Sequence, residues 1–495
     1  MSNISVYSDI ILERRPLLKT ILHQYGDLSI WKATNLLLDK GKANANLFNR
    51  KFINVIQSTF PHLESEYLQK LDICLQKNPL VSTADHQCPI NHPVYINSNI
   101  QLSLFTKSFS LNKKPYIMPP ILSFSSLPIN NTAYIRGLLM ASPKGEKRFT
   151  FFGSSMRHDA LPTVKPLCFD KKTINYWIEV NRNNFSKQEL GFIYSVLNLV
   201  STKTDINQCA SYSQQINVWN KWLWRKFFPN YHMEFLPIDL LSKTFFAEEL
   251  VNNTSLPLYK FLFDLSEEEQ LKLFDGIYGC WSLDLLKDFK GGGTCFFWGI
   301  NKNHRMIPLL RKNKQLVSQD KSFPSINWNP ISIAQAWKEN KITPSLLMNY
   351  LIMAGHFGLF CSGAFNQIGY LQPMMKQYSS GLKKLGLLSE SERIDEISTD
   401  GIHAFLYFLF GTTKELAIPL CGLNMLQEVE KMNRVEDVLK KITVNDAFKI
   451  TAPLIFPYIV NNNDLKSCNF SFEKSYGEIL PFIPSPFVIQ NWKTN

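Results

Sequence analysis

Apolar residues recur at three- and four-residue spacing through the first 76 residues, which is the period of a helix with one buried face. Gly41 and Pro61 interrupt the pattern. Because both residue types disfavour a helix interior, they separate neighbouring helices. The pattern therefore predicts a helical segment over residues 1–80, with helices at 12–25, 28–41, 48–60 and 64–77.

Short β-branched and aromatic runs replace this period from Ile100 onward. The runs YIRGLLMAS and RFTFFG flank the turn sequence PKGEK, between Pro143 and Lys147, which is typical of a β-hairpin. We therefore expect residues 94–155 to be rich in mixed or antiparallel sheet, within a sheet-rich region spanning 81–185.

Helical spacing returns beyond Ser186 and dominates the region 186–495, with helices predicted at 187–200, 213–228 and 266–277. Ser266 and Glu269 stand three residues apart before the last of these, as in a capping box. A second hairpin is predicted near residues 293–311. The fold class is therefore α+β and mostly helical. Because no Gly/Ser-rich or Pro-rich linker separates the regions, we expect one interlocked body.

Residues 342–375 contain no Asp, Glu, Lys or Arg. That length would permit a membrane span, but the run carries several Asn, Gln, His and Gly residues, and such polar density is costly in lipid. The sequence favours a buried helix over 343–359, with Thr343 as its cap and Pro344 in its first position. A membrane association is disfavoured.

The composition is that of a folded protein, with 45% hydrophobic and 13% aromatic residues. A formal net charge of +12 favours an anionic partner. The basic residues are scattered and do not alternate with aromatic residues as in a groove that tracks a nucleic-acid strand. We therefore expect a small anionic or polar molecule as the partner, and not a nucleic acid.

Nine cysteines are spread along the chain without a CxxC pair, and an odd number cannot all form disulfides. The N-terminal residues include Asp9, Glu13, Arg14 and Arg15, which interrupt the apolar stretch that a signal peptide needs. Both observations predict a cytoplasmic protein, with Cys88 reduced.

The segment Ser82–Asn99 carries the densest chemistry, with Asp85, His86, Cys88 and His92 within eight positions. Three interpretations remain open. His86, Cys88 and His92 could bind a divalent metal, Zn or Fe, with a fourth ligand from elsewhere. Asp85 and the imidazoles could instead form a metal-free acid–base site, in which Asp85 orients an imidazole or acts as the base. The loop could also be purely structural, held by its own hydrogen bonds.

Two further segments supply polar side chains that could complete this site. The loop Leu127–Gly137 contains Asn131 and Arg136, whose amide and guanidinium could bind a substrate carboxylate or phosphate, unless Arg136 lies on a solvated strand. The charge-free run contains His356, Asn366 and Gln367, and lining a pocket is a common reason for such residues in an apolar segment. His356 is the first candidate to join His86.

These observations predict an enzyme with a His/Asp acid–base site, with or without a metal, acting on a small anionic or polar substrate in hydrolytic or related chemistry. Asp85, His86, His92 and His356 are the predicted catalytic residues, and Asn131, Arg136, Asn366 and Gln367 the predicted substrate-binding residues. The alternative is a non-enzymatic interaction protein with a basic surface that carries aromatic residues, for which the tryptophan-rich stretch 218–228 is the candidate.

Overall fold

The computed structural model describes residues 3–110, 117–130, 135–229, 233–275, 277, 295–318, 322–364, 366–404, 410–427, 435–460, 462–483 and 488–489. Helices dominate, and the strands form several small sheets. The mixed α+β class is therefore confirmed.

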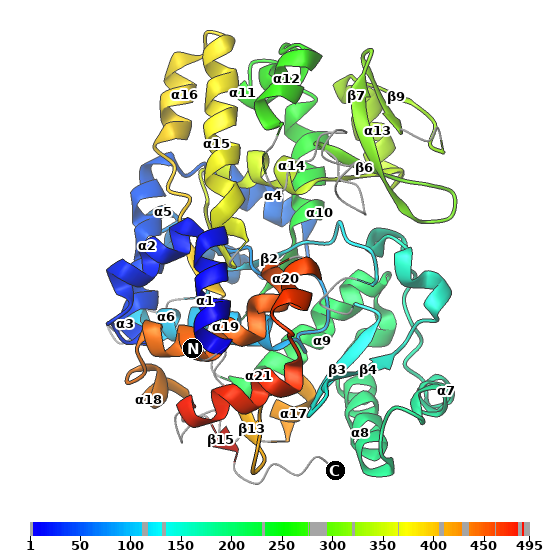
Figure 1. Cartoon of the computed structure of the whole chain (residues 1–495). Helices are drawn as coiled ribbons and strands as arrows, with labels where there is room; N and C mark the ends of the chain where they lie inside the picture. Colours follow the sequence, from blue (N-terminus) through cyan, green and yellow to red (C-terminus); the bar gives the residue numbers. More distant parts are fainter. Residues whose placement is uncertain are drawn as a thin grey trace.

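The four helices predicted near the N-terminus are present as α2 (Pro16–Tyr25), α3 (Ile30–Asp39), α4 (Lys51–Thr59) and α5 (Ser65–Lys77). Helix α1 (Asn3–Arg14) was not predicted, and the helix predicted at 12–25 begins only at Pro16. Pro16 occupies the first turn of α2, where its missing N–H costs nothing, and the Ser29 side chain caps α3. Helix α1 packs against α19 (Val444–Ile459) and α21 (Phe472–Ile479), so the two ends of the chain share one region of the molecule (Figure 1).

A five-stranded parallel sheet lies at the centre of the fold. Its strands are β1 (Leu80–Ser82), β2 (Ile121–Ser123), β5 (Phe235–Pro237), β11 (Phe360–Ala364) and β12 (Ile402–Ala404). They are ordered β12-β11-β1-β2-β5, and every neighbouring pair is parallel. The chain winds outward from β1 to β5 and then returns to β11, on the other side of β1. This is the strand order of open, doubly wound sheets, with the switch point between β1 and β11.

Alternate residues of this sheet belong to two different hydrophobic cores. One core contains Leu80, Ile121, Phe235 and Phe360, and the other contains Val81, Leu122, Leu236 and Cys361. The first core also includes side chains of α1, α2, α3, α6 (Pro93–Ser110), α8 (Lys187–Lys203), α9 (Tyr212–Phe227) and α19. The second includes side chains of α4, α5, α10 (Ile238–Phe245), α14 (Leu346–Tyr350) and α15 (Gln367–Lys384). The sheet is thus covered by helices on both faces.

Both predicted hairpins are confirmed. Strands β3 (Gly137–Ser142) and β4 (Gly145–Thr150) pair antiparallel, and Gly145 takes a φ of +108° that suits glycine. Strands β6 (Phe297–Ile300) and β7 (Met306–Lys312) form the second hairpin. It extends into an antiparallel sheet with β8 (Gln315–Ser318), β9 (Ile326–Asn327) and β10 (Ile342–Pro344). A third sheet contains β13 (Phe410–Thr412), β14 (Ala417–Pro419) and β15 (Val488–Ile489).

The first part of the region predicted to be sheet, residues 94–110, is instead the helix α6. Its β-branched and aromatic residues, such as Ile96, Ile100 and Phe105, are fully buried, and so are polar residues on its other faces, such as Asn99 and Ser103. Because α6 is buried nearly all round, it has no polar face to produce a helical period. Tertiary packing therefore decides its conformation.

The predicted buried helix at 343–359 begins later and is shorter than expected. Pro344 ends strand β10, Ser345 caps α14, and a wide helical turn follows at Leu351–His356. The prediction that this segment is buried is confirmed. Within the part of the chain that the structure describes, no helix combines the length and apolar character needed to cross a membrane.

The helices predicted at 187–200, 213–228 and 266–277 correspond to α8, α9 and α12 (Glu267–Phe274), and the Ser266–Glu269 capping box is present. The remaining helices are α7 (Lys171–Asn181), α11 (Pro257–Phe263), α13 (Pro330–Lys338), α16 (Leu388–Asp395), α17 (Gly422–Leu426), α18 (Val435–Leu439) and α20 (Asn462–Ser467).

Candidate functional site

The loop after β1 leaves the carboxyl end of the central strand, beside the switch point of the sheet. The Thr83 backbone N–H donates to the Ser362 carbonyl (2.7 Å) on β11, and the Gln87 N–H donates to the Phe124 carbonyl (2.9 Å) after β2. The loop is therefore anchored to both neighbours of β1. In doubly wound sheets, the crevice outside the carboxyl ends of the strands at the switch point is the usual ligand site.

His86 is the one residue between 78 and 93 that is not buried. Its Nδ1 lies 3.1 Å from the hydroxyl of Tyr95, in the first turns of α6, and the two rings pack with their centroids 5.5 Å apart. This contact fixes the orientation of the imidazole. His86 thus combines solvent access with a positioned ring, as proton exchange requires.

Asp85 is fully buried, and neither of its carboxyl oxygens has a hydrogen-bond partner. Burial raises the pKa of Asp85 well above its usual value. The side-chain amides of Asn91 and Asn99 are likewise buried without partners. The expectation that Asp85 orients an imidazole is not met, because Tyr95 occupies that role for His86. Unsatisfied buried polar groups are costly, so their concentration in one short segment calls for an explanation.

Cys88 and His92 face different surroundings. The side chain of Asn220 on α9 accepts from the Ile90 N–H (2.8 Å) and donates to the Cys88 carbonyl (2.9 Å). The Cys88 thiol is free, as predicted, and burial raises its pKa well above the usual value. Its thiolate is therefore disfavoured. His92 is buried, and its Nδ1 accepts from the Val94 N–H (3.3 Å) while its Nε2 lies 3.3 Å from Glu146 Oε1.

No three His, Cys, Asp or Glu side chains come together in the described residues as a metal ion would require. His86, Cys88 and His92 therefore do not form the predicted zinc or iron site. The physical reason is that His92 turns toward Glu146 and the Cys88 thiol is held in the apolar core. His86 and His92 do share a neighbour, because both rings pack against Tyr95, at 5.5 and 5.6 Å between centroids.

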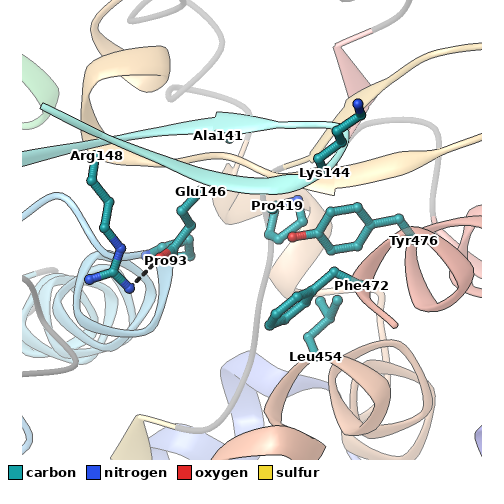
Figure 2. Close-up of a pocket in the computed structure, with 10 residues that line it drawn as sticks. Pro93, Ala141, Lys144, Glu146, Arg148, Pro419, Leu454, Phe472 and Tyr476 are labelled. Carbon is teal, nitrogen blue, oxygen red and sulfur yellow. Dashed lines mark ion pairs between the residues drawn. The ribbon is translucent and has the colours of Figure 1, made fainter. Parts of the chain in front are cut away.

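Glu146 connects this loop to a pocket of about 250 Å³ beneath the β3–β4 hairpin. The pocket is lined by Pro93, Ala141, Lys144, Gly145, Glu146, Arg148, Pro419, Leu454, Phe472 and Tyr476. Figure 2 shows Glu146 and Arg148 descending from the hairpin on one side, with Phe472, Tyr476 and Leu454 opposite. None of these residues was predicted from the sequence to belong to a site.

Arg136 lies in the turn directly before β3 and is half-buried, and Asn131 falls outside the described residues. The hydroxyl of Tyr212 on α9 donates to the Ile135 carbonyl (2.6 Å), and the next residue, Ser213, donates to the Gln87 side chain (2.7 Å). Helix α9 therefore holds the segment containing Arg136 near the loop after β1. The anion-binding role of Arg136 stays a prediction.

Asn366 and Gln367 follow β11 and lie at the same sheet edge as the loop. The Gln367 Oε1 accepts from the hydroxyls of Thr83 and Tyr350, each at 2.8 Å, so Gln367 clamps the start of the loop. Asn366 Oδ1 accepts from Nη2 of Arg15 (2.7 Å), at the junction of α1 and α2. Arg15 is thereby brought to the switch point.

His356 does not join His86, which corrects the prediction. Strands β1 and β11 are parallel with Leu80 opposite Phe360. His356 precedes Phe360, whereas His86 follows β1, so the two imidazoles lie at opposite edges of the sheet. His356 is buried against the ring of Phe245 (4.5 Å between centroids), and burial lowers its pKa to about 3.

Tyr95, Arg15 and Glu146 are the neighbours that sequence reasoning missed. Tyr95 lies inside the polar segment Ser82–Asn99, in the first turn of α6. Because it is close in sequence to His86, a local sequence pattern could have identified it. Arg15 is 351 residues from Asn366, and no local signal links them.

Comparison with models of known protein families and with curated proteins finds no match for this chain.

Proposed function

We propose that this chain is an enzyme that performs acid–base chemistry on a small polar or anionic molecule at the carboxyl edge of its central sheet. One observation carries the proposal. At the switch point, the only solvent-accessible residue between 78 and 93 is His86, and the residue beside it is a buried carboxyl without a hydrogen-bond partner.

Each residue has a distinct role. His86 exchanges a proton with the substrate, and the Tyr95 hydroxyl holds its ring in position. Asp85, whose pKa burial raises well above its usual value, donates a hydrogen bond in its protonated form to a group that gains negative charge. Arg15 and Arg136 hold the negative charge of the substrate. Hydrolytic or related chemistry needs no more than these groups.

We place the enzyme in the cytoplasm. The eight cysteines that the structure describes are all free thiols, and thiols persist in a reducing compartment.

The experiment is a turnover screen of the purified chain against phosphate esters, carboxylic esters and amides of small metabolites, combined with thermal shift. His86→Ala should lower turnover about 10²- to 10⁴-fold, the usual contribution of a general acid or base. His62→Ala, which removes a histidine exposed on the surface, is the matched control and should leave turnover unchanged. Activity that survives His86→Ala contradicts the proposal, and so does a wild-type chain that no compound stabilises and that turns none over.

A second candidate, a non-enzymatic interaction protein, draws support from a surface groove of about 540 Å³. Trp219 and Trp224 of the tryptophan-rich stretch are buried in the core, but Trp222 lines this groove beside Phe192 and Leu199, with Lys226 over its ring. If the chain acts only through this groove, Trp222→Ala abolishes partner binding while His86→Ala has no effect on any activity of the chain.

A further inference from the structure

The pocket beneath the β3–β4 hairpin places opposite charges side by side on one wall. Glu146 and Arg148 are two residues apart on β4, so both side chains leave the same face of the strand. Glu146 Oε2 lies 3.9 Å from Arg148 Nη2, which is close enough for attraction and too long for a hydrogen bond. The two side chains therefore attract each other without a hydrogen bond between them.

His92 holds the Glu146 carboxylate in place. Because the Val94 N–H donates to Nδ1 of His92, the imidazole proton lies on Nε2, which donates to Glu146 Oε1. Burial lowers the pKa of His92, more than the nearby Glu146 raises it, so His92 is neutral at pH 7. Glu146 thus gains a hydrogen bond from a neutral imidazole, and Oε2 remains on the side of Arg148.

The opposite wall of the pocket is apolar and aromatic. Phe472 and Tyr476 are four residues apart on α21 and point into the pocket from one helix face, beside Leu454 of α19 and Pro419 of β14 (Figure 2). A ligand here meets a charged wall on one side and a hydrophobic wall on the other.

We propose that this pocket binds a zwitterionic molecule of amino-acid size. Glu146 accepts the ammonium group, Arg148 donates to the carboxylate, and Phe472 packs against the apolar side chain. In an α-amino acid the ammonium and the carboxylate are attached to one carbon. Their close spacing matches that of Glu146 and Arg148, which carry opposite charges on the same face of β4. A simple anion is repelled by Glu146 and a simple cation by Arg148. The volume of about 250 Å³ suits a molecule of this size. The pocket borders the loop through Pro93 and Glu146, but none of the residues that line it belongs to the proposed acid–base site, so the proposal does not depend on the proposed function.

The test is calorimetric titration of the full chain with the twenty protein amino acids. Each amino acid that binds is compared with its N-acetyl derivative, which lacks the ammonium, and with its decarboxylated amine, which lacks the carboxylate. We expect an apolar amino acid to bind and both analogues to bind at least about ten-fold more weakly, the usual value of a charge-assisted hydrogen bond.

Three variants locate the site. Glu146→Gln and Arg148→Gln should each weaken binding about ten-fold or more. Lys147→Gln is the matched control, because Lys147 lies between them on β4 but points to the other face, where it pairs with Glu189 at 2.7 Å. Its binding constant should equal that of the wild type. The side chain of Arg148 is 44% exposed, so Arg148→Gln should fold even if Glu146→Gln does not.

The proposal is overturned by any of three results: no amino acid binds at millimolar concentration, the N-acetyl derivative binds as tightly as the free amino acid, or Arg148→Gln binds like the wild type.

Discussion

Two buried aspartates lie at the same edge of the central sheet but differ in their hydrogen bonding. Asp239 follows β5, and its carboxylate accepts from both the backbone N–H and the hydroxyl of Ser125 and of Ser126, and from the amide of Asn349. Asp85 follows β1 and has no hydrogen-bond partner. Both side chains are almost fully shielded from water.

The difference separates a structural carboxyl from a functional candidate. Asp239 ties the turn after β2 to β5 and to α14, so its burial is compensated by hydrogen bonds. Burial of Asp85 has no such compensation, which makes it a local cost to the fold. Natural proteins tolerate such costs mainly at sites of function. The predictions below test this distinction.

The largest effect is expected for Asp239→Ala. Removing the carboxylate leaves several buried donors unsatisfied, and we expect the free energy of unfolding to fall by about 3–5 kcal/mol. Urea denaturation measures the change. Asp395→Ala, which removes a surface carboxylate paired with Lys383, is the control and should change stability by less than about 1 kcal/mol. A loss below 1 kcal/mol for Asp239→Ala would show that the network is not structural.

A second prediction uses His403, the histidine of β12, whose ring lies between the hydroxyls of Ser82 (3.1 Å) and Ser362 (2.7 Å). Burial lowers its pKa from 6.5 to about 3. Below pH 6.5 the unfolded chain binds a proton that the folded chain does not, so stability is lost as the pH falls from 6.5 toward 3. At pH 5 the loss is about 2 kcal/mol.

His403→Gln should reduce the slope by the part that His403 contributes, whereas His356, whose pKa is also lowered to about 3, keeps its own part. The measurement is the free energy of unfolding from pH 7 to pH 5 in the wild type and the variant, and the slope, not the absolute stability, is the readout. Equal slopes would mean that His403 is charged in the folded state or reaches solvent.

The sequence predicts a part of this fold well when the residues that determine it lie close together along the chain, and poorly when they lie far apart. The N-terminal helices and the hairpin at Pro143–Lys147 are encoded within a few residues, by period and turn chemistry, and were predicted. The central sheet was not predicted, because most of its strands are three residues long and apolar without alternation. Their pairing joins segments as distant as Leu80 and Phe360.

The same distinction holds for the candidate site, where features determined by nearby residues were predicted and features determined by distant residues were not. The loop at Asp85 and His86 was found because its polar residues are concentrated within eight positions. The placement of His356 was wrong because strand direction decides which edge a residue occupies, and direction is a property of the assembled sheet. The pairing of Glu146 with His92 also requires the hairpin to fold over the start of α6, which no local pattern encodes.

The third prediction concerns Asp85 and has the opposite sign. Its pKa is raised in the folded chain, so above about pH 3.9 the unfolded chain releases a proton that the folded chain keeps. This contribution to stability is fully present below that pH and is lost as the pH rises toward the folded pKa. Asp85→Asn should therefore be more stable than the wild type above about pH 3.9, with a gain that grows as the pH rises toward the folded pKa of Asp85.

Asp85→Asn should at the same time lose activity, because an amide N–H is a weaker hydrogen-bond donor than a carboxylic acid to the group that gains negative charge. Chemical denaturation at several pH values measures the gain, and the turnover screen measures the loss. A destabilised variant would show that Asp85 is a structural carboxyl like Asp239. The proposed difference between the two aspartates would then be wrong.

The smallest effect is expected for Tyr95→Phe, which removes the hydroxyl that contacts His86 and keeps the ring between His86 and His92. The lost hydrogen bond should reduce stability by about 0.5–1 kcal/mol. If Tyr95 positions the imidazole, kcat should fall while KM stays the same, because the substrate does not touch the hydroxyl. Tyr176→Phe, which removes the hydroxyl of a tyrosine that is 64% exposed on α7, should change neither quantity. An unchanged kcat in Tyr95→Phe would mean that His86 needs no positioning, and the solvent access of His86 would then be its only distinction from the buried His403.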